Sequence, residues 1–205
     1  NDLVAECINS PEVKKLKQVS PDVVFKIHYD EDLFNIYASD VHIRKALINL
    51  VLNAADAVKT RGNISISTLN RYLEAPLKGY EKVSIGEYAV LSIADNGPGI
   101  SSKDLGRIFE PFYTKKKMGR SGTGLGLSVV WNVIRDHQGF IDVKTGDSGT
   151  TFELYFPITR DVILSKDLSL SIKSYKGNGE MVLVVDDENS QREISCKILD
   201  KLGYE

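Results

Sequence analysis

The chain has 205 residues, of which 42% are hydrophobic and 26% are charged, an ordinary composition for a soluble globular protein. The net charge of -2 argues against a nucleic-acid-binding protein that relies on bulk positive charge, and no apolar run approaches the roughly 20 residues of a membrane span. Cys7 and Cys196 lie far apart and outside any Cys-x-x-Cys pair, so neither a zinc site nor a disulfide framework is indicated. We therefore expect a cytoplasmic protein with two reduced thiols and no membrane contact through this segment. The chain does not begin with Met, so we expect it to belong to a longer protein, whose membrane anchoring is left open.

Apolar periodicity predicts most of the secondary structure. The clearest signal starts at Asp40, where apolar residues recur at spacings near 3.6 and Asp40 itself can cap the helix. Alternating runs elsewhere predict strands, and Gly139 is expected to stop a second amphipathic helix. The elements expected in chain order are weak helix at 1–20, broken at Ser10-Pro11; strands at 23–28 and 35–38; a helix from 40 to near Gly62; a strand at 64–68; an irregular excursion at 70–87; a strand at 88–94; a short helix at 101–109; a helix at 125–137; and an antiparallel strand pair at 140–144 and 151–156, ended by Pro157.

The last part of the chain differs in pattern. Residues 161–179 lack a firm period and are rich in Ser, Lys and Gly, as is typical of a linker. Residues 181–185 form a continuous apolar run, which predicts a strand buried on both faces, as in a parallel sheet. Asp186 and Asp187 follow, and then a helix is expected at 190–202. This order predicts the first βα unit of a second domain.

Two amides share one face of the helix that starts at Asp40. Asn49 and Asn53 are four residues apart, so their side chains lie on the same, otherwise apolar, face. One interpretation is a pair of amides satisfied by backbone or water, because an unsatisfied buried amide is costly. The other is that a side-chain carbonyl holds Mg²⁺, a hard cation that prefers oxygen and shares its coordination with phosphates and water.

Asp95 ends a predicted strand, and Gly97 and Gly99 follow it. An ionised carboxylate only accepts hydrogen bonds, so Asp95 can bind an exocyclic amino group such as that of adenine. The glycines permit a sharp turn and a close approach of the backbone. Taken alone, an Asp-x-Gly-x-Gly sequence is a common turn, and only its combination with other motifs indicates a site.

A second glycine run, with Gly122, Gly124 and Gly126, precedes the helix predicted at 125–137. Backbone N–H groups at such a helix start can bind phosphate, although a lone Gly-x-Gly-x-Gly is weak evidence. No evident strand precedes it, which argues against a dinucleotide-binding fold. Nearby basic residues either add positive charge for a polyphosphate or form a solvated surface run: Lys115, Lys116, Lys117 and Arg120. Phe109 and Phe112 flank Glu110-Pro111 before this basic loop, and either pack in the core or anchor the loop over a nucleotide.

In order and spacing these segments resemble the catalytic, ATP-binding domain of sensor histidine kinases, in the superfamily that includes gyrase, the Hsp90 chaperones and the MutL proteins. Residues 48–57 look like the N box, 95–100 the G1 box, 108–113 the F box and 122–127 the G2 box. The resemblance covers roughly residues 33–157. It implies an α/β fold, a two-layer sandwich in which helices pack on one face of a mixed β-sheet, and a role in bacterial two-component signalling with ATP and Mg²⁺.

The resemblance also implies roles for single residues. Asn53 would coordinate Mg²⁺ with ATP, Asn49 would lie beside the phosphates, and Asp95 would bind the adenine amino group. Thr150 would sit near adenine through water, with Thr151 as the alternative. Residues 113–121 would form the ATP lid, and the sequence does not rank its basic residues. The other expected nucleotide contacts are Gly97, Gly99, Lys115, Lys116, Arg120, Gly122, Thr123, Gly124, Leu125 and Gly126.

Asn49 separates two classes of enzyme within this superfamily. ATP-hydrolysing members usually carry a Glu four residues before the metal-binding Asn, as the base that activates water, whereas histidine kinases carry an amide. Phosphoryl transfer depends on positioning and charge neutralisation more than on such a base. The resemblance therefore favours a protein-histidine kinase over an ATPase, and a non-catalytic nucleotide-binding module is a third hypothesis.

The resemblance also predicts partners and boundaries. No His-Glu/Asp-x-x-Asn-Pro motif is present, and the three histidines are each expected to be surface or core residues, so the acceptor histidine would lie on a dimerisation domain outside this chain. The tail resembles the start of a response-regulator receiver domain, with Asp186 and Asp187 as an incomplete Mg²⁺-binding pair, as in a hybrid kinase. We expect a monomer without nucleic acid, divided into a dimerisation-domain remnant at 1–20, the ATP-binding domain at 21–160, a linker at 161–179 and a truncated receiver at 180–205.

Overall fold

The computed structural model describes residues 1–115, 123–161 and 175–205, and the basic residues Lys116, Lys117 and Arg120 fall outside these ranges. The chain divides into two compact units, residues 1–161 and residues 162–205. The helices of the first unit are α1 (Asp2–Ile8), α2 (Pro11–Val19), α3 (Asp40–Val58), α4 (Ser102–Leu105) and α5 (Gly126–Asp136). Its strands are β1 (Asp22–His28), β2 (Asn35–Ile36), β3 (Arg61–Leu73), β4 (Leu77–Lys78), β5 (Lys82–Val83), β6 (Gly86–Asp95), β7 (Phe140–Gly146) and β8 (Gly149–Thr159).

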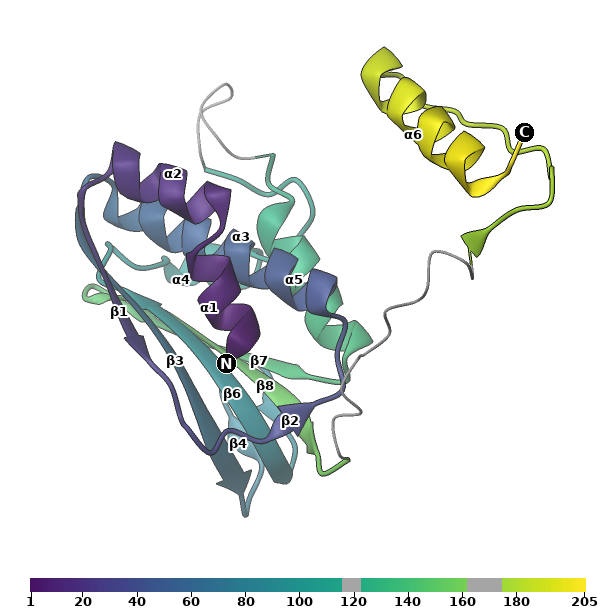
Figure 1. The fold of residues 1–205 in the computed structure, drawn as a ribbon. Coiled ribbons are helices and arrows are strands. Elements are labelled where there is room, and N and C mark those ends of the chain that lie inside the picture. Colours follow the sequence, from purple (N-terminus) through teal and green to yellow (C-terminus); the bar gives the residue numbers. More distant parts are fainter. Residues whose placement is uncertain (116–122, 162–174) are drawn as a thin grey trace. The chain divides into compact units, whose positions relative to one another are not determined.

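The main sheet of the first unit is mixed. Its strand order is β1-β3-β6-β8-β2, and β7 also pairs with β8. β1 pairs with β3 in parallel, whereas the other neighbours in this sheet are antiparallel. The helices α1, α2, α3 and α5 cover one face of the sheet (Figure 1). The predicted two-layer α/β sandwich is therefore confirmed.

The core lies between α3, α5 and the sheet. The helix repeat of α3 directs Leu47, Leu50 and Val51 inward, and these side chains are at most 1% exposed. Alternation along the strands supplies the facing layer, because every second side chain of a strand points to the same face. The buried strand residues of this core are Val23, Ile64, Ile66, Leu91, Ile93, Ile141, Val143, Phe152, Leu154 and Phe156.

The N-terminal helices are part of the same core. Val4, Cys7 and Val13 are buried against it, and α1 and α2 both pack on α3. Ser10 caps α2 by accepting a hydrogen bond from the Val13 N–H, and Pro11 occupies the first turn, where its missing N–H costs nothing. Burial raises the pKa of the Cys7 thiol to about 11, so Cys7 is a packing residue and not a reactive one.

Both ends of α3 differ from the prediction. The cap position is Ser39 and not Asp40, and the Ser39 N–H donates to Nε2 of His137 at 2.9 Å. The helix ends at Val58 and not near Gly62, because Lys59 adopts a φ of 59° and the chain then enters β3. The sequence pattern missed this end because no glycine or proline marks it before Gly62.

Several strands are longer than predicted. β3 runs to Leu73 and β6 starts at Gly86, so only the segment between them leaves the sheet, and it carries the β4–β5 hairpin. β8 continues through Pro157 to Thr159, because β2 pairs with its last residues. β2 itself is shorter than predicted.

The excursion between β3 and β6 covers part of the second face and part of one edge of the sheet. Val83 from β5 packs with Tyr88, Val90 and Tyr155 in a smaller core. Glu81 accepts a hydrogen bond from the backbone N–H of Ile141 in β7. Since an uncovered strand edge invites pairing with another chain, this contact blocks part of the β7 edge.

The C-terminal unit contains the predicted helix, α6 (Asn189–Leu202), but not the predicted strand. Residues 181–185 have no ladder in the described part of the unit, and Met181 and Leu183 are 88% and 86% exposed. A strand requires neighbours that pair its backbone and cover its faces, and residues 175–205 supply only the helix and the chain end. The expectation of a strand buried on both faces is therefore wrong for this structure. The predicted linker falls mostly on residues 162–174, outside the described residues.

Candidate functional site

Asn49 lies beside the start of α5. Its Nδ2 donates to the Lys45 carbonyl at 2.9 Å, which fixes the orientation of the amide. A β-carbon on Gly126 would lie 3.0 Å from Asn49 Oδ1, so the amide oxygen points at the first turn of α5. Asn53 is half-buried one turn further along α3, on the same face. Asn49 is thus brought to a helix start whose free N–H groups and dipole favour an anion, and Asn53 follows one turn later on the same face of α3.

Asp95 ends β6 between two partner strands. It pairs with Ile64 of β3 and with Thr150 of β8, and its Oδ1 accepts the Gly97 N–H at 2.8 Å. Burial raises the pKa of the Asp95 carboxyl, and backbone hydrogen bonds from Gly97 and Thr150 only partly offset this. The carboxylate is held in one orientation and retains acceptor capacity for a donor group of a ligand.

The turn after Asp95 packs on the β7–β8 hairpin. Gly99 has a φ of 74°, and a β-carbon there would lie 2.1 Å from the Gly146 carbonyl oxygen, so only glycine fits. Thr145 Oγ1 accepts the Ile100 N–H at 2.7 Å and lies 3.1 Å from Thr150 Oγ1. The structure therefore brings Thr150 next to the Asp95 turn.

Thr151 lies differently from Thr150. The two residues point to opposite faces of β8 because side chains alternate along a strand. Thr150 is 4% exposed on the face that carries the helices, whereas Thr151 is half-buried on the other face. Of the two threonines considered from the sequence, Thr150 is the one with a place in this arrangement.

Phe112 and Gly124 join the two ends of the segment predicted as a lid. Gly124 has a φ of 71°, and a β-carbon there would lie 2.5 Å from the Phe112 carbonyl carbon. Thr123 is exposed, and Leu125 precedes the first turn of α5. The expectations for Lys116, Arg120 and Gly122 fall outside the described residues.

The two phenylalanines of the F box differ. Phe109 stacks 5.0 Å from Trp131 and 5.2 Å from Tyr80, measured between ring centroids, and packs against the core. Phe112 is 73% exposed and has a φ of 65°. Core packing therefore explains Phe109 but not Phe112.

The chain matches a known family over residues 38–160. The model of that family is described as histidine kinase-, DNA gyrase B- and HSP90-like ATPase. The chain belongs to this family. The matched range contains every sequence-predicted site residue except Asp186 and Asp187.

Relatives of this ATPase-family chain include sensor kinases. It is 33% identical over 196 residues to sensor kinase CckA of Brucella abortus, a match that covers 91% of the chain and 20% of CckA. It is 37% identical over 148 residues to the sensory histidine kinase/phosphatase NtrB of Rhizobium leguminosarum bv. phaseoli, covering 70% of the chain and 37% of NtrB. The chain thus spans about a fifth and a little over a third of these proteins.

A solved structure agrees with the fold. The nucleotide-free catalytic domain of histidine kinase ThkA superposes with a TM-score of 0.62 at 28% identity, covering 78% of this chain and 92% of that domain.

In the described ranges, none of the helices is long and apolar enough to span a membrane.

Within this ATPase-family fold, Asp104 and Thr145 lie near the candidate site but were not predicted from the sequence. Asp104 in α4 accepts hydrogen bonds from Ser101 Oγ and from the Tyr113 hydroxyl, and forms an ion pair with Lys115. These donors hold the pKa of the Asp104 carboxyl well below its usual range. Thr145 also escaped prediction. The Ser-x-x-Asp spacing from Ser101 to Asp104 is a local helix-start pattern, but the contacts of Asp104 with Tyr113 and Lys115 and those of Thr145 depend on the fold.

The donor set fits a metal that arrives with its own ligands. No group of three or more His, Cys, Asp or Glu side chains able to hold a metal occurs among the residues that the structure describes. The amide oxygens of Asn49 and Asn53 suit Mg²⁺ that keeps phosphate and water in its coordination shell, rather than a metal caged by protein. In the C-terminal unit, one carboxylate oxygen of Asp186 accepts the Glu188 N–H at 2.8 Å.

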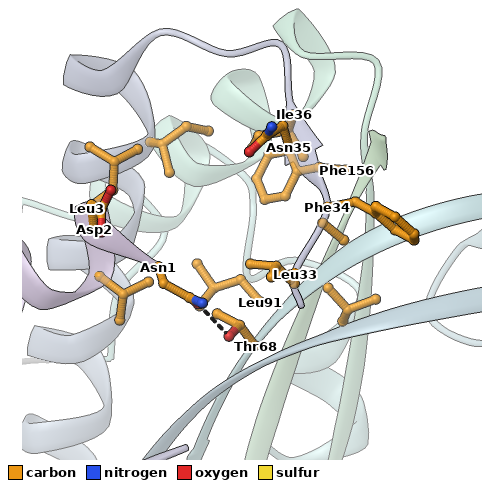
Figure 2. A pocket seen from close by; sticks show the side chains of 14 residues that line it. Asn1, Asp2, Leu3, Leu33, Phe34, Asn35, Ile36, Thr68, Leu91 and Phe156 are labelled. Carbon is orange, nitrogen blue, oxygen red and sulfur yellow. Dashed lines mark hydrogen bonds between the residues drawn. The ribbon is translucent and has the colours of Figure 1, made fainter. Parts of the chain in front are cut away.

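A cavity of about 200 Å³ lies elsewhere in the first unit. Figure 2 shows Asn1, Leu33, Ile36, Thr68 and Phe156 around it. The Thr68 hydroxyl donates a hydrogen bond to the side-chain oxygen of Asn1. None of the sequence-predicted site residues lines it. The candidate site is therefore defined by the contacts at α3, α5 and the Asp95 turn, not by this hollow.

Proposed function

We propose that residues 21–160 form the ATP-binding catalytic domain of a hybrid sensor histidine kinase. The domain binds ATP with Mg²⁺ and transfers the γ-phosphoryl group to a histidine on a dimerisation domain of the same protein. The observation that carries this proposal is the position of Asn49. Its amide oxygen faces the start of α5, the place proposed for the phosphates, where an ATP-hydrolysing relative would need a carboxylate base.

The proposed binding roles come from the family resemblance, and the geometry is compatible with them. Asp95 accepts a hydrogen bond from the adenine amino group, and Thr150 contributes through water beside it. The glycines at 97 and 99 keep this turn free of side chains. N–H groups at the start of α5 hold phosphate, with Lys115, Lys116 and Arg120 as further phosphate ligands. Asn53 holds Mg²⁺ with the nucleotide, and the metal supplies neutralisation of the phosphate charge.

The chemical step depends on positioning. The acceptor nitrogen forms a bond to the γ-phosphorus while the bond to the oxygen bridging the β- and γ-phosphates breaks, and ADP leaves with that oxygen. Asn49 cannot take up a proton at neutral pH, so it does not activate water. The site is thereby biased toward transfer and against hydrolysis.

The acceptor is proposed to lie outside these 205 residues. His137 uses both ring nitrogens, with Nδ1 2.6 Å from the Val133 carbonyl and Nε2 bonded to the Ser39 N–H. His42 lies beside it, with ring centroids 6.0 Å apart. His28 lies on β1 and is not followed by the acceptor motif. These placements support a structural role for His137, whereas His28 and His42 are exposed surface histidines.

The C-terminal unit is proposed to begin a receiver domain that carries Asp186 and Asp187 as two of its Mg²⁺ ligands. The match to CckA covers 91% of the chain, so it runs past residue 180 whichever end it leaves out. This continuity supports the placing of the linker and the start of the C-terminal unit in one kinase with the ATP-binding domain. We further propose residues 1–20 as a remnant of the dimerisation region, a cytoplasmic location for the domain and a monomeric state for the fragment.

Titration with ATP and Mg²⁺ tests the site. We expect the wild type to bind, and Asp95→Asn and Asn53→Ala to bind about tenfold more weakly or worse, as expected when a hydrogen bond to a charged group or a metal ligand is lost. Unchanged binding in both variants would remove the site assignment. Steady phosphate release by the isolated chain would favour an ATPase, and binding without transfer to a competent cognate acceptor would favour a nucleotide-sensing module.

A further inference from the structure

The Asp104 carboxylate in α4 contacts three side-chain donors, two of which lie at the end of the F box or just after it. The carboxylate accepts hydrogen bonds from Ser101 Oγ and from the Tyr113 hydroxyl, the latter at 2.6 Å, and pairs with the Lys115 ammonium. The Asp104 side chain is 13% exposed, whereas that of Lys115 is 70% exposed. A solvated lysine therefore reaches back to a mostly shielded carboxylate.

Lys115 is close along the chain to a residue that packs near the proposed phosphate site, but its ammonium is already paired with Asp104. Lys115 follows Phe112 by three residues, and the Phe112 backbone packs on Gly124. Two residues later Gly126 opens α5 opposite Asn49. Lys115 is thus three residues from a backbone contact that leads into α5, and its charge is already paired with Asp104.

The remaining contacts of this cluster do not depend on Lys115. The Arg107 guanidinium lies 4.4 Å from the centroid of the Tyr113 ring and pairs with Glu110 at 2.9 Å. Tyr113 therefore keeps its place on Asp104 through its hydroxyl and its ring when the lysine leaves.

We propose that Asp104 is a positioning residue that competes with the nucleotide phosphates for Lys115. The proposal rests on the proposed function and deepens it. Without nucleotide, the Asp104 carboxylate holds the ammonium; with a polyphosphate bound, the ammonium moves to phosphate while Ser101 and Tyr113 remain on Asp104. Because ion pairs of exposed lysines contribute little, the exchange is reversible and changes affinity by about two- to fivefold.

Calorimetric titration with MgATP and with adenosine tests the exchange. The chains compared are the wild type, Asp104→Asn, Lys115→Ala, the double variant, and Asp136→Asn, an exposed carboxylate on the last turn of α5 that serves as a matched charge control. We expect Asp104→Asn to bind MgATP about two- to fivefold more tightly, with adenosine binding unchanged. The gain should vanish in the Lys115→Ala background and be absent in Asp136→Asn.

The outcomes separate this proposal from the function on which it rests. A wild type that fails to bind MgATP overturns both. A wild type that binds, with Asp104→Asn binding no more tightly than Asp136→Asn, or gaining equally without Lys115, overturns the exchange alone. Carboxyl ¹³C NMR of the unaltered chain gives a readout that needs no variant to fold: the Asp104 signal should shift with MgATP but not with adenosine, and an unmoved signal contradicts the proposal.

Discussion

Gly124 packs directly against the backbone of Phe112, so closely that a β-carbon on Gly124 would lie 2.5 Å from the Phe112 carbonyl carbon. Both residues also have positive φ, at 71° and 65°. This contact joins the end of the F box to the residues that lead into α5. The close approach of residues 112 and 124, which flank the segment predicted as a lid, therefore depends on a glycine at position 124.

Gly124→Ala should destabilise this junction. The added β-carbon meets backbone atoms, which cannot move aside like a flexible side chain, and alanine disfavours this φ. We expect a loss of about 1–3 kcal/mol in the free energy of unfolding, measured by urea denaturation. The matched control is Gly106→Ala, where φ is -69° and a β-carbon meets nothing within 4 Å. Equal effects of the two substitutions would contradict the role given to the Phe112 contact.

Glu153→Gln should destabilise the second face of the sheet. Glu153 is 6% exposed and pairs with Arg71 at 3.1 Å and Lys144 at 2.9 Å. Removing its charge leaves these partners uncompensated, and we expect a cost of about 1–3 kcal/mol by denaturant titration. Glu87→Gln, which removes an exposed pair with Arg160, should cost under about 1 kcal/mol.

The same carboxyl gives a pH dependence of stability. Burial opposes ionisation of Glu153, but bonds from Lys144, Arg71 and Tyr155 outweigh it and hold its pKa below the usual value of 4.5. A lowered pKa in the folded state means that this stabilisation is complete above the unfolded-state pKa and is lost as pH falls through the folded-state pKa. Acid unfolding curves of wild type and Glu153→Gln should therefore converge at low pH. A constant difference would contradict the assignment.

Nucleotide affinity should fall in mild acid because of Asp95. The ionised carboxylate accepts the adenine amino group more strongly than the protonated acid does, and burial raises the Asp95 pKa above its ordinary value of 3.8. The loss should thus begin at higher pH than for an ordinary aspartate. Because the folded domain takes up this proton more readily than the unfolded chain, the group itself favours folding as pH falls, so unfolding through Asp95 cannot imitate the loss. The pH profile of MgATP affinity should flatten in Asp95→Asn, and an unaltered profile would exclude Asp95 as the acceptor.

Leu47→Ala tests whether α3 anchors the core. Leu47 of α3 is fully buried in the core. Its truncation should lower the free energy of unfolding by about 2–5 kcal/mol, measured by thermal or denaturant unfolding. Val41→Ala, on the same helix and 71% exposed, should change stability by less than about 0.5 kcal/mol. Similar effects from the two substitutions would contradict the burial of Leu47 in the core and the exposure of Val41.

The sequence predicted most of the strands and the major helices because local rules govern them. Asn49 and Asn53 share a helix face by spacing alone, and the turn at Gly99 requires a residue that tolerates positive φ. Element ends were less predictable. Lys59 ends α3 without a glycine, and β8 passes through Pro157 because β2 pairs there.

Features that depend on distant partners could not be predicted. The three donors on Asp104 come from separate positions along the chain, and the Thr145 bridge from Ile100 to Thr150 exists only once the hairpin meets the Asp95 turn. The expected strand at 181–185 failed for the opposite reason. Its apolar run is the local signal of a strand, but the described residues of its unit provide no strand to pair with.

The proposed reaction is phosphoryl transfer to a histidine outside this chain. Its most direct test is incubation of the chain with γ-labelled ATP, Mg²⁺ and the separately produced dimerisation domain of the parent protein, followed by detection of acid-labile label on that domain. We expect label on the domain's acceptor histidine, none after Asn53→Ala, and negligible free phosphate from the chain alone. Absence of label on a folded, competent cognate domain, or steady phosphate release without it, would contradict the account.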